Sequence, residues 1–88
     1  MFKVTDGKGF QMTFANGHTV SVQFGYGNYS ANRDEQKFGE DAKDSRTAEF
    51  AAWDAGGNWI RFEGECDDVI GYLTTDEVLA RINEVASK

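Results

Sequence analysis

Residues 10–29 read FQMTFANGHTVSVQFGYGNY, and this stretch decides the fold. Apolar or aromatic residues occupy every second position before the Asn16-Gly17 pair and again after it. Period-two alternation is typical of half-buried β-strands, and an Asn-Gly pair between two such runs is a strong β-hairpin signal. The stretch therefore predicts a hairpin whose second strand leads into a loop rich in glycine and tyrosine.

The register of this hairpin follows from the requirement that one face of the sheet be apolar. A two-residue loop would mix apolar and polar side chains on both faces. A three-residue loop that ends at Gly17 instead pairs Met12 with Val20, and the apolar side chains then share one face. It also places His18, the single histidine, opposite Phe14 as a partly buried structural residue. We expect a type I turn followed by Gly17 in the left-handed region, which forms a G1 bulge.

A second hairpin is predicted further along the chain. Alternation resumes over residues 47–53, Gly56 and Gly57 supply a turn, and residues 59–62 form the returning strand. This arrangement places Trp53 opposite Trp59 on the face away from the core, where cross-strand aromatic pairs stabilise a sheet. The long loop, the terminal helix or a second subunit could cover the two indoles, and we prefer a cover from within the chain.

The C-terminal segment carries a helix signal. Thr74 and Glu77 form a capping box, and apolar residues then recur at helical spacing, which predicts a helix over 75–86. Residues 2–4 are expected to form a short strand, and residues 69–72 a short strand or an extended entry to the helix. The fold class is therefore α+β, a small antiparallel sheet of four to five strands (two hairpins) with one C-terminal helix packed on one face.

Length and charge restrict the function. Eighty-eight residues make a single domain, 1–88, with a net charge of −6. Residues 1–33 carry +2 and residues 34–88 carry −8, which argues against broad binding to a nucleic acid backbone. An acidic surface serves solubility in most proteins, and mimicry of a nucleic acid is the sharper alternative. The sequence contains no run of about 20 apolar residues, so no membrane span is predicted. The single cysteine needs no oxidising compartment, which points to the cytoplasm.

Residues suited to catalysis are few, so we expect a protein that is not an enzyme and carries no cofactor. Cys66 lies among carboxylates, a negatively charged setting in which a thiol is a poor nucleophile. A dyad of Cys66 with His18 is formally available but is not favoured. The acidic bend over residues 63–68 lacks the spacing of a calcium-binding loop, so no metal site is predicted.

The segment from Gly25 to Arg33 is the strongest candidate for binding. Its tyrosines offer stacking faces, and its amide and guanidinium groups offer donors within a few residues. Such a set suits a protein interface, or a flat ligand such as a nucleotide; alternatively, the tyrosines cap the edge of the core. A single helical turn is expected over residues 32–38. The candidate binding residues are Tyr26, Asn28, Tyr29, Asn32, Arg33, Trp53 and Trp59.

The runs GFQMTFANGHTVSVQFGYGNY, AEFAAWDAGGNWIRF and GYLTTDEVLARI resemble a family of small uncharacterised bacteriophage proteins with an MTFxNGxTVSVQFGxGNY motif. The resemblance covers most of the chain outside residues 33–46. It implies a phage source and a context in the host cytoplasm, and it brings no activity to carry over. It favours an accessory protein that binds and inhibits a host protein, including host defence; the alternatives are sequestration of a small nucleotide-like signal and nucleic-acid mimicry. A homo-oligomer stays open.

Overall fold

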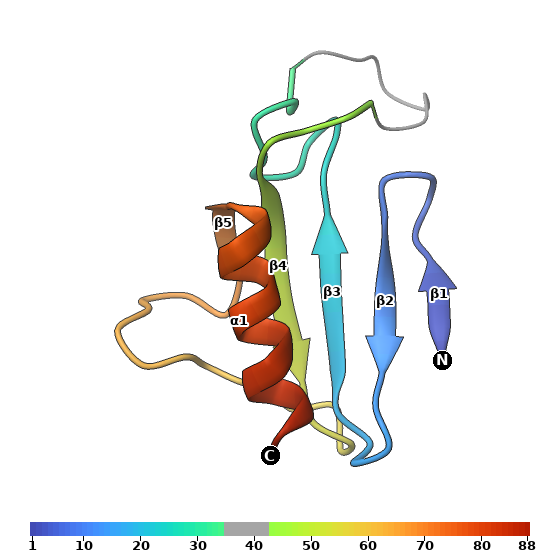
Figure 1. Cartoon of the computed structure of the whole chain (residues 1–88), viewed down its shortest axis with the longest axis vertical. Helices are drawn as coiled ribbons and strands as arrows, with labels where there is room; N and C mark the ends of the chain where they lie inside the picture. Colours follow the sequence, from blue (N-terminus) through green and yellow to red (C-terminus); the bar gives the residue numbers. More distant parts are fainter. Residues whose placement is uncertain (35–42) are drawn as a thin grey trace.

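The computed structural model describes residues 1–34 and 43–88, which form one antiparallel sheet with one helix on it (Figure 1). The sheet order equals the sequence order, so each strand pairs with its neighbours in the chain. The predicted α+β class is thereby confirmed, while the helical turn expected over 32–38 lies mostly outside the described residues. The elements are β1 (Phe2–Val4), β2 (Gly9–Thr13), β3 (Thr19–Gln23), β4 (Ala48–Trp53), β5 (Ile70–Leu73) and α1 (Thr75–Ala86).

The first hairpin, β2–β3, has the predicted register. Met12 pairs with Val20, and the Phe14 amide donates a 2.9 Å hydrogen bond to the His18 carbonyl. Gly17 has φ 85°, and its amide donates to the Phe14 carbonyl at 2.9 Å. A residue in the left-handed region at this point creates the G1 bulge, which shifts the register so that one face is apolar.

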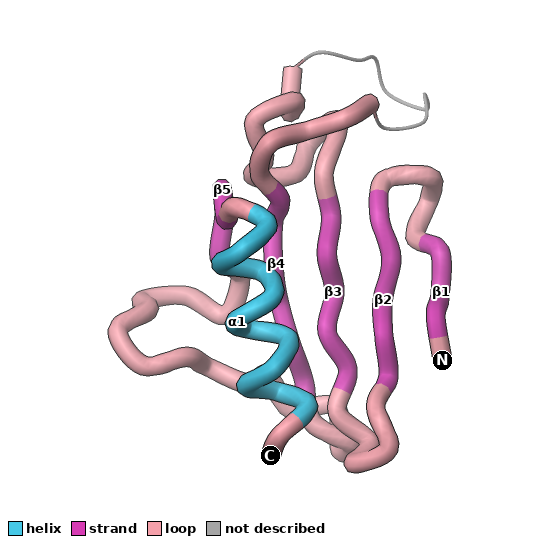
Figure 2. The backbone as a smooth tube through the Cα atoms, viewed as in Figure 1, coloured by secondary structure: helices cyan, strands magenta, loops and turns pink. Residues whose placement is uncertain are grey.

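Helix α1 begins at the predicted capping box. The Thr74 hydroxyl accepts a hydrogen bond from the Glu77 amide, and the Glu77 carboxylate accepts one from the Thr74 amide at 3.0 Å. These hydrogen bonds from Thr74 lower the pKa of Glu77 below its usual value. The helix contacts β3, β4 and β5 but neither β1 nor β2, and Figure 2 shows that it lies over one side of the sheet only.

The core lies between α1 and the sheet. Alternate residues of β3 and β4 point into it, and the helix contributes the fully buried Val85. As period-two alternation requires, the other face carries Thr19, Ser21 and Gln23 on β3 and Glu49, Ala51 and Trp53 on β4. The largest buried members are Val20, Val22, Phe50, Phe62, Ile70 and Leu73.

The predicted returning strand over 59–62 is wrong. Only one bridge forms there, between Trp53 and Trp59, and the Ile60 amide donates to the Ala52 carbonyl at 2.9 Å. The rest of that edge of β4 pairs with β5 instead. The chain therefore leaves the sheet after Ile60, although Phe62 stays buried, with its ring centroid 5.7 Å from that of Phe50.

Candidate functional site

The loop after β3 is built around Asn32. Its side chain is 1% exposed; the Asn32 Oδ1 accepts hydrogen bonds from the Gly25 amide at 2.6 Å and the Ser30 hydroxyl at 2.9 Å. The Asn32 Nδ2 donates to the Lys43 carbonyl at 2.7 Å. These bonds close the loop on itself, so Asn32 fixes its shape and presents no exposed amide to a ligand.

Asn28 and Tyr26 also fail to form a shared ligand site with the rest of the loop. The Asn28 side-chain amide turns inward and donates to the Phe24 carbonyl at 3.2 Å. The Tyr26 ring is exposed, and the Lys8 ammonium, from the turn just before β2, lies 5.7 Å from the ring centroid. Tyr26 is therefore on the β2 side of the sheet, away from the other exposed tyrosine of this loop.

Tyr29 joins a cluster beside β4 and β5, across the sheet from β2. The Tyr29 carbonyl accepts a 2.8 Å hydrogen bond from the Tyr72 amide, and the Tyr29 amide donates to Glu49 Oε1 at 3.3 Å. The two tyrosine ring centroids are 6.4 Å apart, and the Arg33 guanidinium lies 4.9 Å from the Tyr29 ring centroid. We call Tyr29, Arg33 and Tyr72 the tyrosine cluster.

A bulge in β5 makes this cluster. Leu73 and Ile70 pair with alternate residues of β4, which leaves both Gly71 and Tyr72 opposite Glu49. Tyr72 has φ 59°, a left-handed conformation that costs a non-glycine residue about 1–2 kcal/mol. A Cβ atom on Gly71 would lie 2.6 Å from the Tyr29 Cβ, so only glycine allows the loop to approach. The sequence analysis missed Tyr72; a glycine inside a short strand was the available signal of a bulge.

The tryptophan pair forms as predicted, but α1 does not cover it. The ring centroids of Trp53 and Trp59 are 5.8 Å apart in an edge-to-face arrangement. Trp53 pairs with Thr19 and so points to the face of the sheet opposite α1, and Trp59 is 54% exposed. The preferred cover from within the chain is therefore not the terminal helix.

Two groups of aromatic residues thus mark the ends of β4 on the face opposite α1. Glu49, beside the tyrosine cluster, and Trp53 are about 13 Å apart at about 3.3 Å per residue. Ala51 lies between them on β4, and Ser21 lies beside Ala51 on β3. Ser21 and Ala51 are each only 8% exposed, so the exposed aromatic side chains of this face lie at the two ends of β4. We call the face of the sheet opposite α1 the free face.

His18, Cys66 and the acidic bend are the candidates for catalysis or metal binding. His18 is half-buried, as predicted, and its Nδ1 has no hydrogen-bond partner among the described residues, while Cys66 is exposed. In the acidic bend, Asp68 pairs with Arg61 at 3.1 Å and Glu65 with Arg81 at 3.4 Å. Within residues 1–34 and 43–88, no group of three or more His, Cys, Asp or Glu side chains could hold a metal ion.

None of the described helices is long and apolar enough to cross a membrane. Comparisons with protein-family models, curated proteins and solved structures found no match to this chain, so its function is inferred from its own residues.

Proposed function

We propose that this chain is a non-enzymatic binding protein that contacts another protein through its free face. The observation that carries the proposal is the tyrosine cluster, in which Tyr29 is 47% and Tyr72 is 54% exposed. Large exposed tyrosines next to an arginine are the residue types that dominate the energy of protein interfaces. Trp59, at the other end of the face, adds a further exposed ring.

The cluster is organised before any partner arrives. The hydrogen bond between Tyr72 and Tyr29 and the bulge at Gly71 fix the backbone of both tyrosines. A binding surface that is already ordered loses less conformational entropy on association. The left-handed conformation of Tyr72 is unfavourable by itself, and a binding role gives a reason for it.

The same geometry favours a protein partner over a nucleotide-like ligand. Arg33 already lies over the Tyr29 ring and Tyr72 leans against it, so the ring has less open surface for a base to stack on. The amides of Asn28 and Asn32 are engaged within the loop. Nucleic-acid mimicry is disfavoured for a different reason: arginines neutralise part of the acidic bend.

The proposed partner is a host protein, which the chain would inhibit in the host cytoplasm as a bacteriophage accessory protein. This part of the proposal is supported by the resemblance of the GFQMTFANGHTVSVQFGYGNY run to small phage proteins. The free face supplies the means of contact, and the resemblance alone suggests the target.

The test is a pull-down from bacterial lysate with the wild type and a Tyr29→Ser/Tyr72→Asn variant, since asparagine tolerates the left-handed region. We expect the variant to keep its melting temperature within a few degrees and to lose the captured host protein. Tyr26→Ser is the matched control, because it removes an exposed tyrosine from the other side of the sheet and should keep the partner. Retention of every partner by the double variant would refute the proposed surface.

Two further measurements separate the alternatives. Native mass spectrometry of the protein purified from cells would show a nucleotide-sized adduct if the chain sequesters a small signal. Steep weakening of the captured complex with salt would indicate an acidic nucleic-acid mimic, because such contacts depend on counterion release. The proposed contact predicts no adduct and a shallow salt dependence.

A further inference from the structure

One side chain ties the last turn of α1 to the turn between β2 and β3. Asn16 is half-buried, and its Nδ2 donates to the main-chain oxygens of Val85, Ala86 and Lys88 at 3.1, 3.4 and 3.2 Å. The last carbonyls of a helix have no partner within the helix, so a donor from elsewhere in the chain satisfies them. Figure 1 shows the C-terminal end of α1 at the same end of the sheet as this turn.

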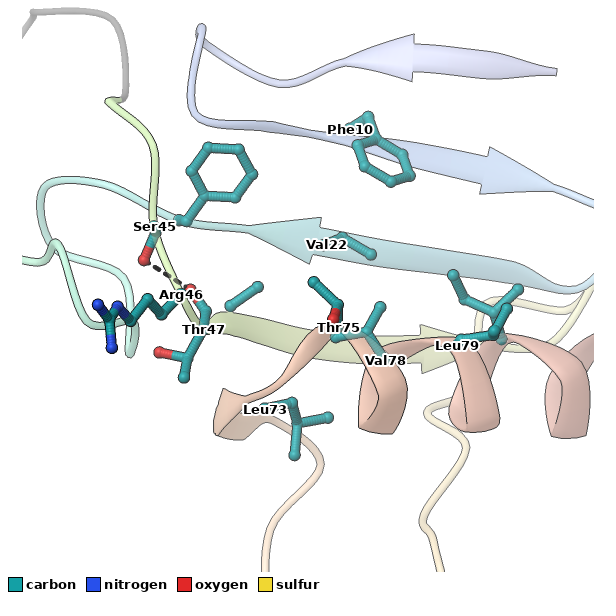
Figure 3. A pocket seen from close by; sticks show the side chains of 12 residues that line it. Phe10, Val22, Ser45, Arg46, Thr47, Leu73, Thr75, Val78 and Leu79 are labelled. Carbon is teal, nitrogen blue, oxygen red and sulfur yellow. Dashed lines mark hydrogen bonds between the residues drawn. The ribbon is translucent and has the colours of Figure 1, made fainter.

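The rest of α1 is held less closely on its β2 side. An apolar groove of about 270 Å³ runs there between α1 and β2, and Phe10, Leu79 and Ile82 are among the residues that line it (Figure 3). The last turn of α1 does not line this groove, since Val85 is fully buried in the core. Asn16 therefore joins the first hairpin to α1 at the end where the helix lies closest to it.

The same residue is the first of an Asn-Gly pair. Asparagine is a thermally labile residue, and it loses its amide most readily when glycine follows, because the attacking nitrogen is then uncrowded. The Gly17 nitrogen attacks Asn16 Cγ, the bond from Cγ to Nδ2 breaks, and the Nδ2 group leaves as ammonia with the proton of the Gly17 amide. Water then opens the resulting succinimide ring to give aspartate or isoaspartate, so water is the one co-reactant.

The folded structure restrains both reacting groups. Asn16 Oδ1 accepts from the His18 amide at 3.0 Å, and the Gly17 amide donates to the Phe14 carbonyl at 2.9 Å. Attack requires the Gly17 nitrogen to give up that proton. It also makes Asn16 Cγ tetrahedral, so that Nδ2 turns away from its partners in α1. The reaction therefore depends on opening of the last turn of α1, a local event that leaves the sheet folded.

We propose that Asn16 is a deamidation site that the docked end of α1 protects, and that its conversion to a carboxylate releases this end of the helix. In the aspartate product an oxygen still accepts from the His18 amide, but no hydrogen is left to donate to α1. The new charge also faces the C-terminal end of a helix, which carries partial negative charge. The isoaspartate product has the same charge and lengthens the main chain at the Gly17 bulge. The modification is therefore a one-way release of α1.

The first test measures the rate of deamidation in mildly alkaline buffer, with peptide mass spectrometry to locate the replacement of NH2 by OH. A sample in urea gives the unprotected rate of the same Asn-Gly pair. We expect the folded wild type to react about tenfold more slowly or less, in proportion to how rarely the end of α1 opens. Val85→Ala, which loosens the last turn, should speed the reaction several-fold. Thr74→Ala, which removes the cap at the other end of α1, should react like the wild type.

The second test measures the release of the helix. Asn16→Asp keeps the shape of the side chain and removes its Nδ2 donor. Hydrogen exchange should become about tenfold faster at the Ser87 amide, which donates to the Asn83 carbonyl, while β2 and β3 keep their protection. Asn58→Asp is the matched control, because the Asn58 side chain lies in the other turn and donates to Asp54. It should leave exchange in α1 unchanged.

The inference is overturned if the folded wild type deamidates as fast as the sample in urea, or if Asn16→Asp leaves exchange at Ser87 unchanged. It is equally overturned if Val85→Ala and Thr74→Ala speed deamidation alike, because general destabilisation would then explain the rate. Tyr29→Ser/Tyr72→Asn should deamidate like the wild type even when it loses a host protein. Those tyrosines lie at the other end of β3, so the proposed function and the release of α1 fail or stand separately.

Discussion

The turn at Asn16 and Gly17 is followed by a full strand, whereas the turn at Gly56 and Gly57 is followed by a single bridge. The two turns themselves are alike. In each, a side-chain oxygen accepts a backbone hydrogen bond: Asn16 Oδ1 from the His18 amide, and Asp54 Oδ1 from the amides of Gly56 and Asn58. Each also has a glycine with positive φ, 85° at Gly17 and 83° at Gly57.

The difference arises beyond the turns. β3 follows the first turn with no other segment competing for the edge of β2. After the second turn, the edge of β4 is shared, because β5 pairs with its first half and places Ile70 and Leu73 in the core. Local turn chemistry therefore sets where the chain reverses, and competition for an edge sets how long the returning strand is.

The largest predicted effect tests whether side-chain packing or strand pairing holds residues 59–62 in place. Phe62 is 2% exposed and lies outside any strand, so Phe62→Ala should cost about 3–5 kcal/mol of unfolding free energy through the cavity that it leaves. Trp59→Ala, which removes the residue at the bridge, should cost only about 0.5–1.5 kcal/mol. Urea denaturation measures both. A larger loss of unfolding free energy for Trp59→Ala than for Phe62→Ala would mean that the bridge, and not the buried ring, holds residues 59–62 in place.

A smaller effect compares the two turn glycines directly. Both Gly17→Ala and Gly57→Ala force alanine to positive φ, which costs about 1–2 kcal/mol. Only at Gly17 does the new Cβ meet another atom, the Ala55 Cβ at 2.8 Å, whereas Gly57 has nothing within 4 Å. Gly17→Ala should therefore cost about 1 kcal/mol more.

The clash at Gly17 has its own rescue. Ala55→Gly in the Gly17→Ala background should recover the extra cost, because it removes the opposing methyl group. The single variant Ala55→Gly corrects for its own backbone effect. Equal costs at both glycines, or no rescue, would show that the two turns are not pressed together.

The smallest effect concerns pH. The hydrogen bond from the Asn58 amide, followed by those from the Asn58 side chain and the Gly56 amide, lowers the pKa of Asp54 below 3.8. A lowered pKa in the folded state adds stability above pH 3.8, and this stability is lost as the pH falls through the folded pKa. Asn16, in the first turn, is neutral and adds no such dependence.

Urea midpoints of the wild type and Asp54→Asn, measured between about pH 6 and pH 2.5, test this difference. The advantage of the wild type should shrink toward the acidic end. The other carboxylates titrate alike in both proteins and so cancel in the comparison. If the difference between the two urea midpoints stayed constant with pH, the charge of Asp54 would make no contribution to stability in the second turn.

The parts of the fold that the sequence predicts are those with local causes. The register of β2–β3 follows from alternation and Gly17, and the bounds of α1 follow from the capping box at Thr74. The returning strand at 59–62 was wrong because β5, whose residues come later in the chain, takes the edge of β4. No pattern within 59–62 contains that information.

The candidate site shows the same division. Sequence proximity suggested that Tyr26 and Tyr29 act together, but the loop closed by Asn32 sends them to different sides of the sheet. Tyr72 joins Tyr29 only through the bulge in β5, a contact between residues 43 positions apart. The apolar groove beside α1, which Phe10 of β2 and Leu79 of α1 line, likewise depends on how far α1 reaches across the sheet.

The sequential strand order also predicts an order of folding. The β2–β3 hairpin closes over a short turn, whereas the pairing of β3 with β4 joins Gln23 to Glu49 across a long loop and carries much of the core. The entropy lost in closing a loop grows with its length, and such non-local pairing limits folding rates. We therefore expect the β2–β3 hairpin to form first and the pairing of β3 with β4, which completes the surface on which α1 packs, to limit the folding rate.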